Sequence, residues 1–245
     1  MKKIIPIKHN KIWGYELWLH SPLEKSRTKL EDGSESIEGP LIKIIKANQP
    51  LSVQVHPDDL LAKELENEDN GKSECWYVLE ASEKSEFIVG IKTKDESTIK
   101  DALKNKTFFE LLKTHKAKPG EFINVPAGLV HGIGKDSKVL EVQQPSDTTY
   151  RFYDYDRLEN GKPRDLHVDK SILSIKDWDW KLDSSEKDYK KYNIESYSIS
   201  IFKKDDNFTI NKKSIIVDIE EEQAYYIEPG EESLIQFNKF ALIEY

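Results

Sequence analysis

The sequence predicts a mainly β protein, built as an antiparallel barrel or sandwich. The middle of the chain consists of many short apolar runs at close spacing. Glycine and proline separate these runs, and one strongly amphipathic helical segment interrupts them. Short strands with turn signals between them are typical of antiparallel folds, whereas a parallel sheet needs a helix between successive strands.

The first core strands are expected after residue 40, where the composition changes. Residues 1–40 are polar and irregular, apart from the dense spot Ile12-Trp13-Gly14-Tyr15. Leu41–Ala47 and Leu51–His56 are β-branched runs, and the turn signal Asn48-Gln49-Pro50 separates them. In the second run apolar and polar side chains alternate, so one face of the predicted strand carries a row of polar groups.

Two helices and further strands are expected in the following order. Asp58 and Asp59 precede a leucine-containing run rich in Glu and Lys, which predicts a short capped helix. Asp95–Lys116 carries apolar residues on one broad face and is predicted to be the longest helix of the chain. The other short runs are predicted strands: Glu74–Glu80, Glu86–Lys92, Glu121–Val125, Leu129–Ile133, Lys138–Gln144 and Thr148–Tyr153.

The chain is expected to divide into three parts. Residues 1–166 are predicted to form the main β domain, with an N-terminal arm and inserted helices. Residues 167–190 are predicted to be a helical linker that contains Trp178 and Trp180. Residues 191–245 return to short β runs and contain no His and no Cys, which predicts a small second β domain without metal ligands.

Composition excludes several classes of partner. The 245 residues, 37% of them hydrophobic, can bury one good core or two small ones. Lys+Arg 37 against Asp+Glu 45 gives a net charge of −8 with no basic block, which argues against nucleic acid but not against a small anionic substrate. The single Cys75 indicates a reducing compartment, and no apolar run approaches the roughly 20 residues of a membrane span. We therefore expect a cytoplasmic protein with no membrane partner.

Four polar residues at strand ends are candidates for a metal site. Gln54 and His56 point to the same face of their predicted strand, and Glu74 begins a later one. His131 enters from another strand after a tight turn. Two imidazoles, a carboxylate and an amide oxygen suit Zn²⁺, with Fe²⁺, Mn²⁺ and Co²⁺ as alternatives. Either histidine alone is better explained as an ordinary strand-end residue, but the set together is not, because a polar row on an apolar strand needs a reason.

Five blocks of the sequence resemble, in order, the type I mannose-6-phosphate isomerases of the short bacterial kind. The blocks are Leu51–Asp58, Gly71–Tyr77, Pro126–His131, Leu140–Gln144 and Ser146–Arg157. The resemblance implies a cupin fold, that is, a jelly-roll-like antiparallel β-barrel, in residues 1–166. It also implies a zinc-dependent aldose–ketose isomerase that interconverts mannose 6-phosphate and fructose 6-phosphate. The tail after residue 190 is shorter than the family's second β domain, so the resemblance leaves open whether the protein is a monomer or a homodimer.

The same resemblance assigns roles to individual residues. The implied ligands of one Zn²⁺ per chain are Gln54, His56, Glu74 and His131. The family's active-site lysine falls on Lys72, its acidic residue on Glu141 and its arginine on Arg151. Ser52 and Arg157 match positions associated with the substrate phosphate.

The implied reaction needs a base that moves a proton between C2 and C1 of the sugar through a cis-enediol. A glutamate beside a metal is ionised at pH 7 without help, whereas a lysine needs a lowered pKa. We therefore favour Glu141 as the base and Lys72 as a proton relay or ring-opening acid. Arg151 would add a fixed cation for the enediolate. Without the resemblance, solvated surface positions or a structural ion pair would explain these residues as well.

Two other classes of function stay open at this stage. Two histidines and a carboxylate also form the iron site of oxygenases, although the amide ligand Gln54 and the downstream arginines disfavour that class. A metal-dependent sugar-phosphate-binding protein, or an isomerase of another aldose, would keep the same pocket. None of the residues that catalysis requires is missing from the sequence, which favours the isomerase.

Overall fold

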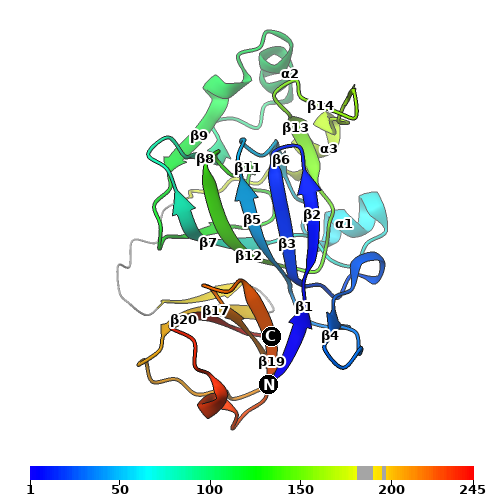
Figure 1. Ribbon diagram of the computed structural model, residues 1–245. Helices are drawn as coiled ribbons and strands as arrows, with labels where there is room; N and C mark the ends of the chain where they lie inside the picture. Colours follow the sequence, from blue (N-terminus) through cyan, green and yellow to red (C-terminus); the bar gives the residue numbers. More distant parts are fainter. Residues whose placement is uncertain (181–189, 195–196) are drawn as a thin grey trace.

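The chain folds into antiparallel sheets, as the spacing of its apolar runs predicts. The computed structural model in Figure 1 describes residues 1–180, 190–194 and 197–245. One sheet contains, in spatial order, β10 (Phe122–Val125), β7 (Glu74–Ala81), β12 (Ser137–Gln143), β5 (Leu41–Ala47), β3 (Gly14–His20) and β2 (Ile7–Lys11). The sheet opposite contains β13 (Tyr150–Tyr153), β6 (Val53–Val55), β11 (His131–Gly132), β8 (Glu86–Ile91) and β9 (Leu112–Lys116).

These two sheets enclose a common core and form the barrel. Trp76 and Val78 of β7 pack in the same apolar cluster as Phe87 and Val89 of β8. Side chains alternate along each strand, so every second residue of both sheets points into the barrel. A mainly β chain with antiparallel sheets confirms the predicted fold class.

Further layers cover both outer faces of the barrel. The helices α2 (Glu96–Lys104) and α3 (Val168–Ser174) contribute Ile99 and Ile172 to the cluster behind the five-stranded sheet. On the other side, Leu140 and Val142 of β12 pack against Ile243 of the C-terminal sheet. The molecule is therefore layered, and the barrel interior lies between its two central sheets.

The C-terminal sheet incorporates strands from the N-terminus. Its order is β16 (Lys190–Ile194), β17 (Tyr197–Lys203), β20 (Lys239–Glu244), β18 (Ser214–Asp218), β19 (Gln223–Ile227), β1 (Lys2–Ile5) and β4 (Lys29–Leu30). Lys2 of β1 lies opposite Tyr226 of β19, and Figure 1 shows the blue N-terminal strand at the edge of the red and orange strands. The predicted second β domain at 191–245 thus shares its sheet with two segments from before residue 31.

The remaining elements are short. They are α1 (Asp59–Glu66), the hairpin of β14 (Leu158–Glu159) and β15 (Lys162–Pro163), and the 3₁₀ turns η1 (Glu24–Ser26), η2 (Phe108–Leu111) and η3 (Glu232–Leu234). The predicted linker at 167–190 begins with α3, and its stretch at 181–189 lies outside the described residues. Among the helices that the structure describes, none is long and apolar enough to cross a membrane.

The helix predicted over Asp95–Lys116 is wrong in its second half. Helix α2 ends at Lys104, and Lys106 adopts a positive φ of 61°, which an α-helix does not accommodate. Residues Leu112–Lys116 then pair with β8 as strand β9. Their side chains satisfy an apolar helical pattern, but the open edge of β8 provides backbone partners, so tertiary pairing outweighs local periodicity.

Candidate metal centre

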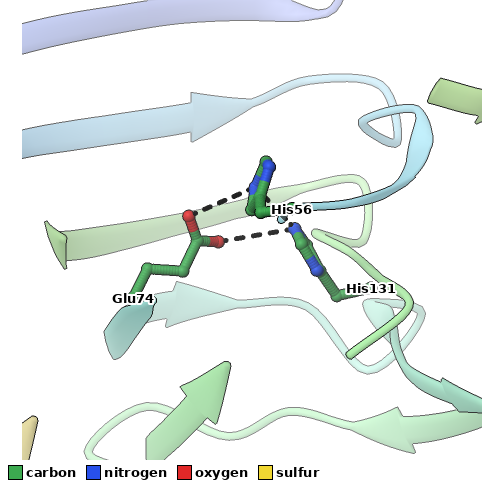
Figure 2. Close-up of side chains that lie close together, drawn as sticks. All are labelled: His56, Glu74 and His131. Atoms are coloured by element: carbon green, nitrogen blue, oxygen red, sulfur yellow. Dashed lines mark hydrogen bonds and ion pairs between the residues drawn. The ribbon is translucent and has the colours of Figure 1, made fainter. Parts of the chain in front are cut away.

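The barrel interior brings His56, Glu74 and His131 together. Figure 2 shows that the two imidazoles and the carboxylate point toward one another from three different segments. Nε2 of His56 lies 3.5 Å from Glu74 Oε2, and Nε2 of His131 lies 3.5 Å from Glu74 Oε1. The two Nε2 atoms are 3.1 Å apart. Among the described residues, these three form a group whose ligand atoms all lie within 4.8 Å of one another.

Strand register explains this convergence. His131 pairs directly with Gln54 across β11 and β6, and Arg151 of β13 pairs with Gln54 on its other side. Three inward-facing polar residues therefore form one row across the five-stranded sheet. Glu74 begins β7 in the opposite sheet, so its carboxylate faces this row.

The three side chains carry the protonation states that a divalent metal requires. Burial, followed by the charge of Lys72, lowers the pKa of His56 to about 3. Burial also lowers the pKa of His131, so both imidazoles are neutral at pH 7. Burial by itself raises the pKa of Glu74, but Lys72 and His56 outweigh it and hold that pKa well below its ordinary value. Neutral imidazoles and an ionised carboxylate are the forms that bind metal.

Buried polar atoms without partners support the same interpretation. Nδ1 of His56 and both carboxylate oxygens of Glu74 are buried and lack a hydrogen bond within the described part of the chain, and Glu74 Oε2 has an ion pair with Lys72 instead. Leaving such groups unpaired costs about 1–3 kcal/mol each. Nδ1 of His131, in contrast, lies 2.8 Å from the carbonyl oxygen of Leu129, which favours the tautomer with a lone pair on Nε2. The donor set fits a metal ion.

Gln54 completes the row. Its Nε2 lies 3.3 Å from His131 Nε2, while its Oε1 accepts a hydrogen bond of 3.1 Å from Ser52 Oγ. The two ends of an amide are exchanged by a half-turn of the side chain, which would direct the oxygen toward the imidazoles. Arg151 Nε donates to the same Ser52 hydroxyl at 3.3 Å, so Ser52 links Gln54 to Arg151.

Lys72 is the positively charged residue that contacts the candidate metal ligands. Its Nζ lies 3.0 Å from His56 Nε2 and 3.1 Å from Glu74 Oε2, and only 6% of its side chain is exposed. The lysine that the resemblance singles out therefore contacts two of the four predicted ligands. It is not the solvated loop residue that its sequence context suggests.

A second row of polar residues crosses the six-stranded sheet, and Glu141 lies at its centre. Lys43 Nζ donates to Glu141 Oε1 at 2.9 Å, and Trp76 Nε1 donates to Glu141 Oε2 at 2.9 Å. Lys43 also donates to Gln143 Oε1 at 2.6 Å and lies over the ring of Trp18, 5.3 Å from its centroid. Burial, followed by the charge of Glu74, raises the pKa of Glu141 although Lys43 pulls it down.

Lys43 is a site residue that sequence reasoning missed. Burial alone lowers its pKa, but Glu141 and Glu16 outweigh that effect and raise it, so the ammonium stays charged. The available signal was alternation, because Leu41, Lys43 and Ile45 share one face of an otherwise apolar strand. A lysine on this face points into the core, where a charged group is rarely found without a polar partner.

The arginines divide into two groups. Arg151 lines the cavity and donates through Nη1 to the carbonyl oxygen of Asp165 at 2.9 Å. Arg157, the predicted phosphate residue, is instead bonded to the side chain and carbonyl oxygen of Asp154 and to the carbonyl oxygen of Pro50. It is not among the cavity-lining residues, whereas Arg164 is.

A cavity of about 420 Å³ adjoins this site. Its walls include Ser52, Gln54, Lys72 and Glu141 from the predicted set. Aromatic walls come from residues Trp13, Trp18 and Trp76. A space of this size suits a small polar molecule rather than a macromolecule.

An antiparallel barrel that encloses two imidazoles, a carboxylate and an amide defines a cupin-like protein with a candidate metal centre. The chain is 43% identical over 167 residues to mannose-6-phosphate isomerase ManA of Bacillus subtilis (strain 168), covering 68% of this chain and 50% of that protein. It is 45% identical over 146 residues to mannose-6-phosphate isomerase of Streptococcus mutans serotype c (strain ATCC 700610 / UA159), covering 59% of this chain and 46% of that protein. The chain thus spans about half the length of the curated relatives it matches. No protein-family model matches the sequence.

Solved structures share the fold over a larger part of the chain. The mannose 6-phosphate isomerase from Bacillus subtilis superposes with a TM-score of 0.73 at 22% identity, covering 100% of this chain and 99% of that one. A mannose 6-phosphate isomerase bound with zinc and yttrium gives a TM-score of 0.64 at 16% identity, covering 99% of this chain and 94% of that one. The predicted resemblance is confirmed, and the chain is a homologue of the mannose-6-phosphate isomerases.

Proposed function

We propose that this protein is a zinc-dependent aldose–ketose isomerase that interconverts mannose 6-phosphate and fructose 6-phosphate. The observation that carries the proposal is the cluster of His56, Glu74 and His131, which contacts two residues of the cavity wall, Gln54 and Lys72. Glu141 and Arg151 line the same cavity. The relatives named as mannose-6-phosphate isomerases support the substrate. A cytoplasmic location and a monomeric or dimeric state stay predictions.

Zinc would be held by His56, Glu74, His131 and the amide oxygen of Gln54, one ion per chain. When bound, it would polarise the substrate's oxygens and stabilise negative charge on them. Zinc binding would change the contacts of Lys72 more than those of any other residue discussed. In the structure its ammonium contacts the atoms of His56 and Glu74 that would bind the metal. The departure of that ammonium toward the cavity would place a proton donor beside the sugar, which suits a relay or ring-opening role.

Glu141 is the proposed base that moves the proton between C2 and C1. Its raised pKa increases its affinity for a proton, and Lys43 and Trp76 orient both carboxylate oxygens. Each oxygen accepts one of these hydrogen bonds and keeps a second lone pair that can accept the proton. Arg151 is proposed to stabilise the enediolate oxygen, and the Ser52 hydroxyl holds its Nε in place.

The test is a linked-enzyme assay of fructose 6-phosphate formation from mannose 6-phosphate, before and after chelation and with zinc added back. We expect activity to disappear on chelation and return with about one zinc per chain, measured by elemental analysis. His131→Ala should lower kcat/KM by at least ~10³-fold, because a bound metal stabilises the transition state by several kcal/mol. His115→Asn is the matched control, since His115 bonds to Glu121 and does not line the cavity.

Other outcomes would point to the alternatives. Folded, zinc-loaded protein that binds mannose 6-phosphate without turnover would indicate a sugar-phosphate-binding protein. Turnover of another aldose phosphate in place of mannose 6-phosphate would indicate an isomerase of different specificity. Oxygen consumption with Fe²⁺ would indicate an oxygenase.

A further inference from the structure

One end of the cavity carries an excess of positive charge. Arg151 and Arg164 line it there together with His167, whose pKa burial lowers so that the imidazole is neutral at pH 7. Asp147 is the carboxylate that the same stretch, residues 147–167, contributes to the wall. His167 adjoins Arg151 directly, because its backbone N–H donates to the Arg151 carbonyl oxygen at 2.8 Å. The other carboxylates of the wall, Glu16 and Glu141, lie beside Lys43, which also lines the cavity. This carboxylate–lysine group belongs to the six-stranded sheet, whereas the two arginines come from β13 and from the loop after β15.

Arg164 is held so that part of its guanidinium stays available. Its Nε and Nη2 donate to the two oxygens of Asp154, each at 2.6 Å. Within the described part of the chain no partner is found for its Nη1, although the side chain is only 15% exposed. The two parallel bonds to Asp154 fix the guanidinium of Arg164 in place. The unpaired Nη1 group is therefore a rigid hydrogen-bond donor on the cavity wall.

Arg157 shares the same carboxylate but is fully occupied. Its Nε donates to the Asp154 carbonyl oxygen at 3.1 Å, its Nη2 to Asp154 Oδ1 at 2.5 Å, and its Nη1 to the Pro50 carbonyl oxygen at 2.6 Å. All three of its nitrogens therefore have protein partners. Arg157 anchors Asp154 and the turn before β6, and Asp154 in turn orients Arg164.

The positive end is unfavourable without an anion. Burial, followed by the charge of Arg164, lowers the pKa of Arg151, which shows that the two guanidiniums repel each other. Asp154 is already shared by two arginines, so it cannot neutralise Arg151 as well. Two converging guanidiniums in a partly dehydrated cavity form a receptor for a dianionic phosphate.

We propose that Arg164 is the residue that binds the phosphate group of the sugar substrate and selects phosphorylated over free aldoses. This inference rests on the proposed isomerase for the identity of the sugar, but not for the binding of phosphate. Arg164 places the phosphate at the end of the cavity away from Glu141, while the carbonyl end of the sugar reaches the metal. Arg151 connects the arginines to the candidate metal ligands, because two hydrogen bonds through Ser52 link it to Gln54.

The experiment compares Arg164→Met with Arg157→Met by calorimetric titration of the zinc-loaded protein with inorganic phosphate, mannose 6-phosphate and mannose. Loss of a charge-assisted bond predicts that Arg164→Met binds inorganic phosphate and mannose 6-phosphate about 10–100-fold more weakly. Its affinity for mannose should change less than about threefold. Arg157→Met also removes one partner of Asp154. It should weaken the binding of all three ligands by about the same factor, and that factor should be smaller than the loss of phosphate affinity in Arg164→Met.

Arg164→Lys keeps the charge without the fork and provides a second reading if the methionine variant does not fold. It should give phosphate affinities between those of the unmodified protein and Arg164→Met. A larger phosphate-specific loss in Arg157→Met than in either Arg164 variant would overturn the inference. Phosphate binding that depends on Arg164 in a protein without isomerase activity would support the inference and refute the proposed function, so the two failures are distinguishable.

Discussion

The barrel interior and the C-terminal sheet bury their residues in opposite ways. The barrel buries Lys43, Glu74 and Glu141 among its core strands, and the contact of Glu74 with a charged partner among the described residues is its ion pair with the buried Lys72. The C-terminal sheet buries apolar side chains on both faces, with Ile215 toward the barrel and Ile216 toward the outer cluster. Buried charges cost free energy unless they are paired, whereas buried aliphatic groups stabilise the fold.

This difference indicates a division of labour. The barrel core holds charges because a small polar substrate and a metal need them there. Its buried charged groups are therefore less completely paired than the apolar side chains of the C-terminal sheet are packed. The C-terminal sheet covers the outer face of the six-stranded sheet and provides much of the apolar contact that compensates. Substitutions in the two regions should therefore affect different quantities, which gives three ways to challenge the comparison.

The largest effect is expected for Glu141→Gln. Removal of a general base lowers kcat by about 10²–10⁴-fold, while zinc content stays at the unmodified level. The free energy of unfolding should also fall by about 3 kcal/mol, because Lys43 loses its carboxylate partner. Steady-state kinetics, elemental analysis and urea unfolding measure the three quantities.

A double variant separates the two consequences of that change. Lys43→Met combined with Glu141→Gln removes the unpaired charge, so much of the lost stability should return without any return of activity. Normal turnover in Glu141→Gln would exclude Glu141 as the base. Loss of zinc in that variant would mean that Glu141 supports the metal instead.

The second prediction concerns the apolar sheet. Ile243 of β20 is completely buried against the barrel, and Ile243→Ala should lower the free energy of unfolding by about 2–5 kcal/mol. The kcat of the folded fraction should stay within about twofold. Ile243→Val serves as the graded control, with an expected loss of about 0.5–1.5 kcal/mol. A selective loss of kcat at unchanged stability would contradict the separation of the two regions.

The smallest effect is expected from His20, which joins the two regions. Its Nε2 lies 2.7 Å from the Tyr226 hydroxyl of β19 and its Nδ1 lies 2.6 Å from the Pro40 carbonyl oxygen. Burial lowers the pKa of His20 to about 4, and the nearby charges of Lys213 and Glu38 act in opposite directions on it. The unfolded chain therefore binds a proton as the pH falls below about 6.5, while the folded chain stays neutral down to about pH 4.

The sign of the pH dependence follows directly. Stability that depends on His20 is present above pH 6.5 and is lost progressively as the pH falls toward 4. Between pH 7.5 and 5.5 the loss should be about 1 kcal/mol, measured by urea unfolding. His20→Gln keeps a hydrogen-bonding side chain without the titration, so its stability should fall by about 1 kcal/mol less over the same interval. Identical pH profiles for the two proteins would exclude His20 as the cause.

The sequence predicts the site better where one strand contributes several groups than where two sheets meet. Gln54 and His56 follow from alternation along a single run, Glu74 and His131 are candidates as polar residues at strand ends, and the resemblance assigns all four to one site. Lys43 and Arg164 were missed because their roles depend on which strands become neighbours and on how the barrel closes. The length of the second helix was misjudged for the same reason, since β9 forms only because β8 offers an edge. The local sequence pattern determines which residues share one face of a strand. The register between strands determines which residues of the neighbouring strands that face contacts.

The pairing of β1 with β19 has a consequence for biosynthesis. Lys2 lies opposite Tyr226, so β1 leaves the ribosome long before its neighbour β19 does. All strands of the barrel precede β19 in the sequence. The barrel can therefore assemble before β19 is synthesised, whereas the C-terminal sheet closes only afterwards, and the edge of β1 that pairs with β19 stays exposed until then.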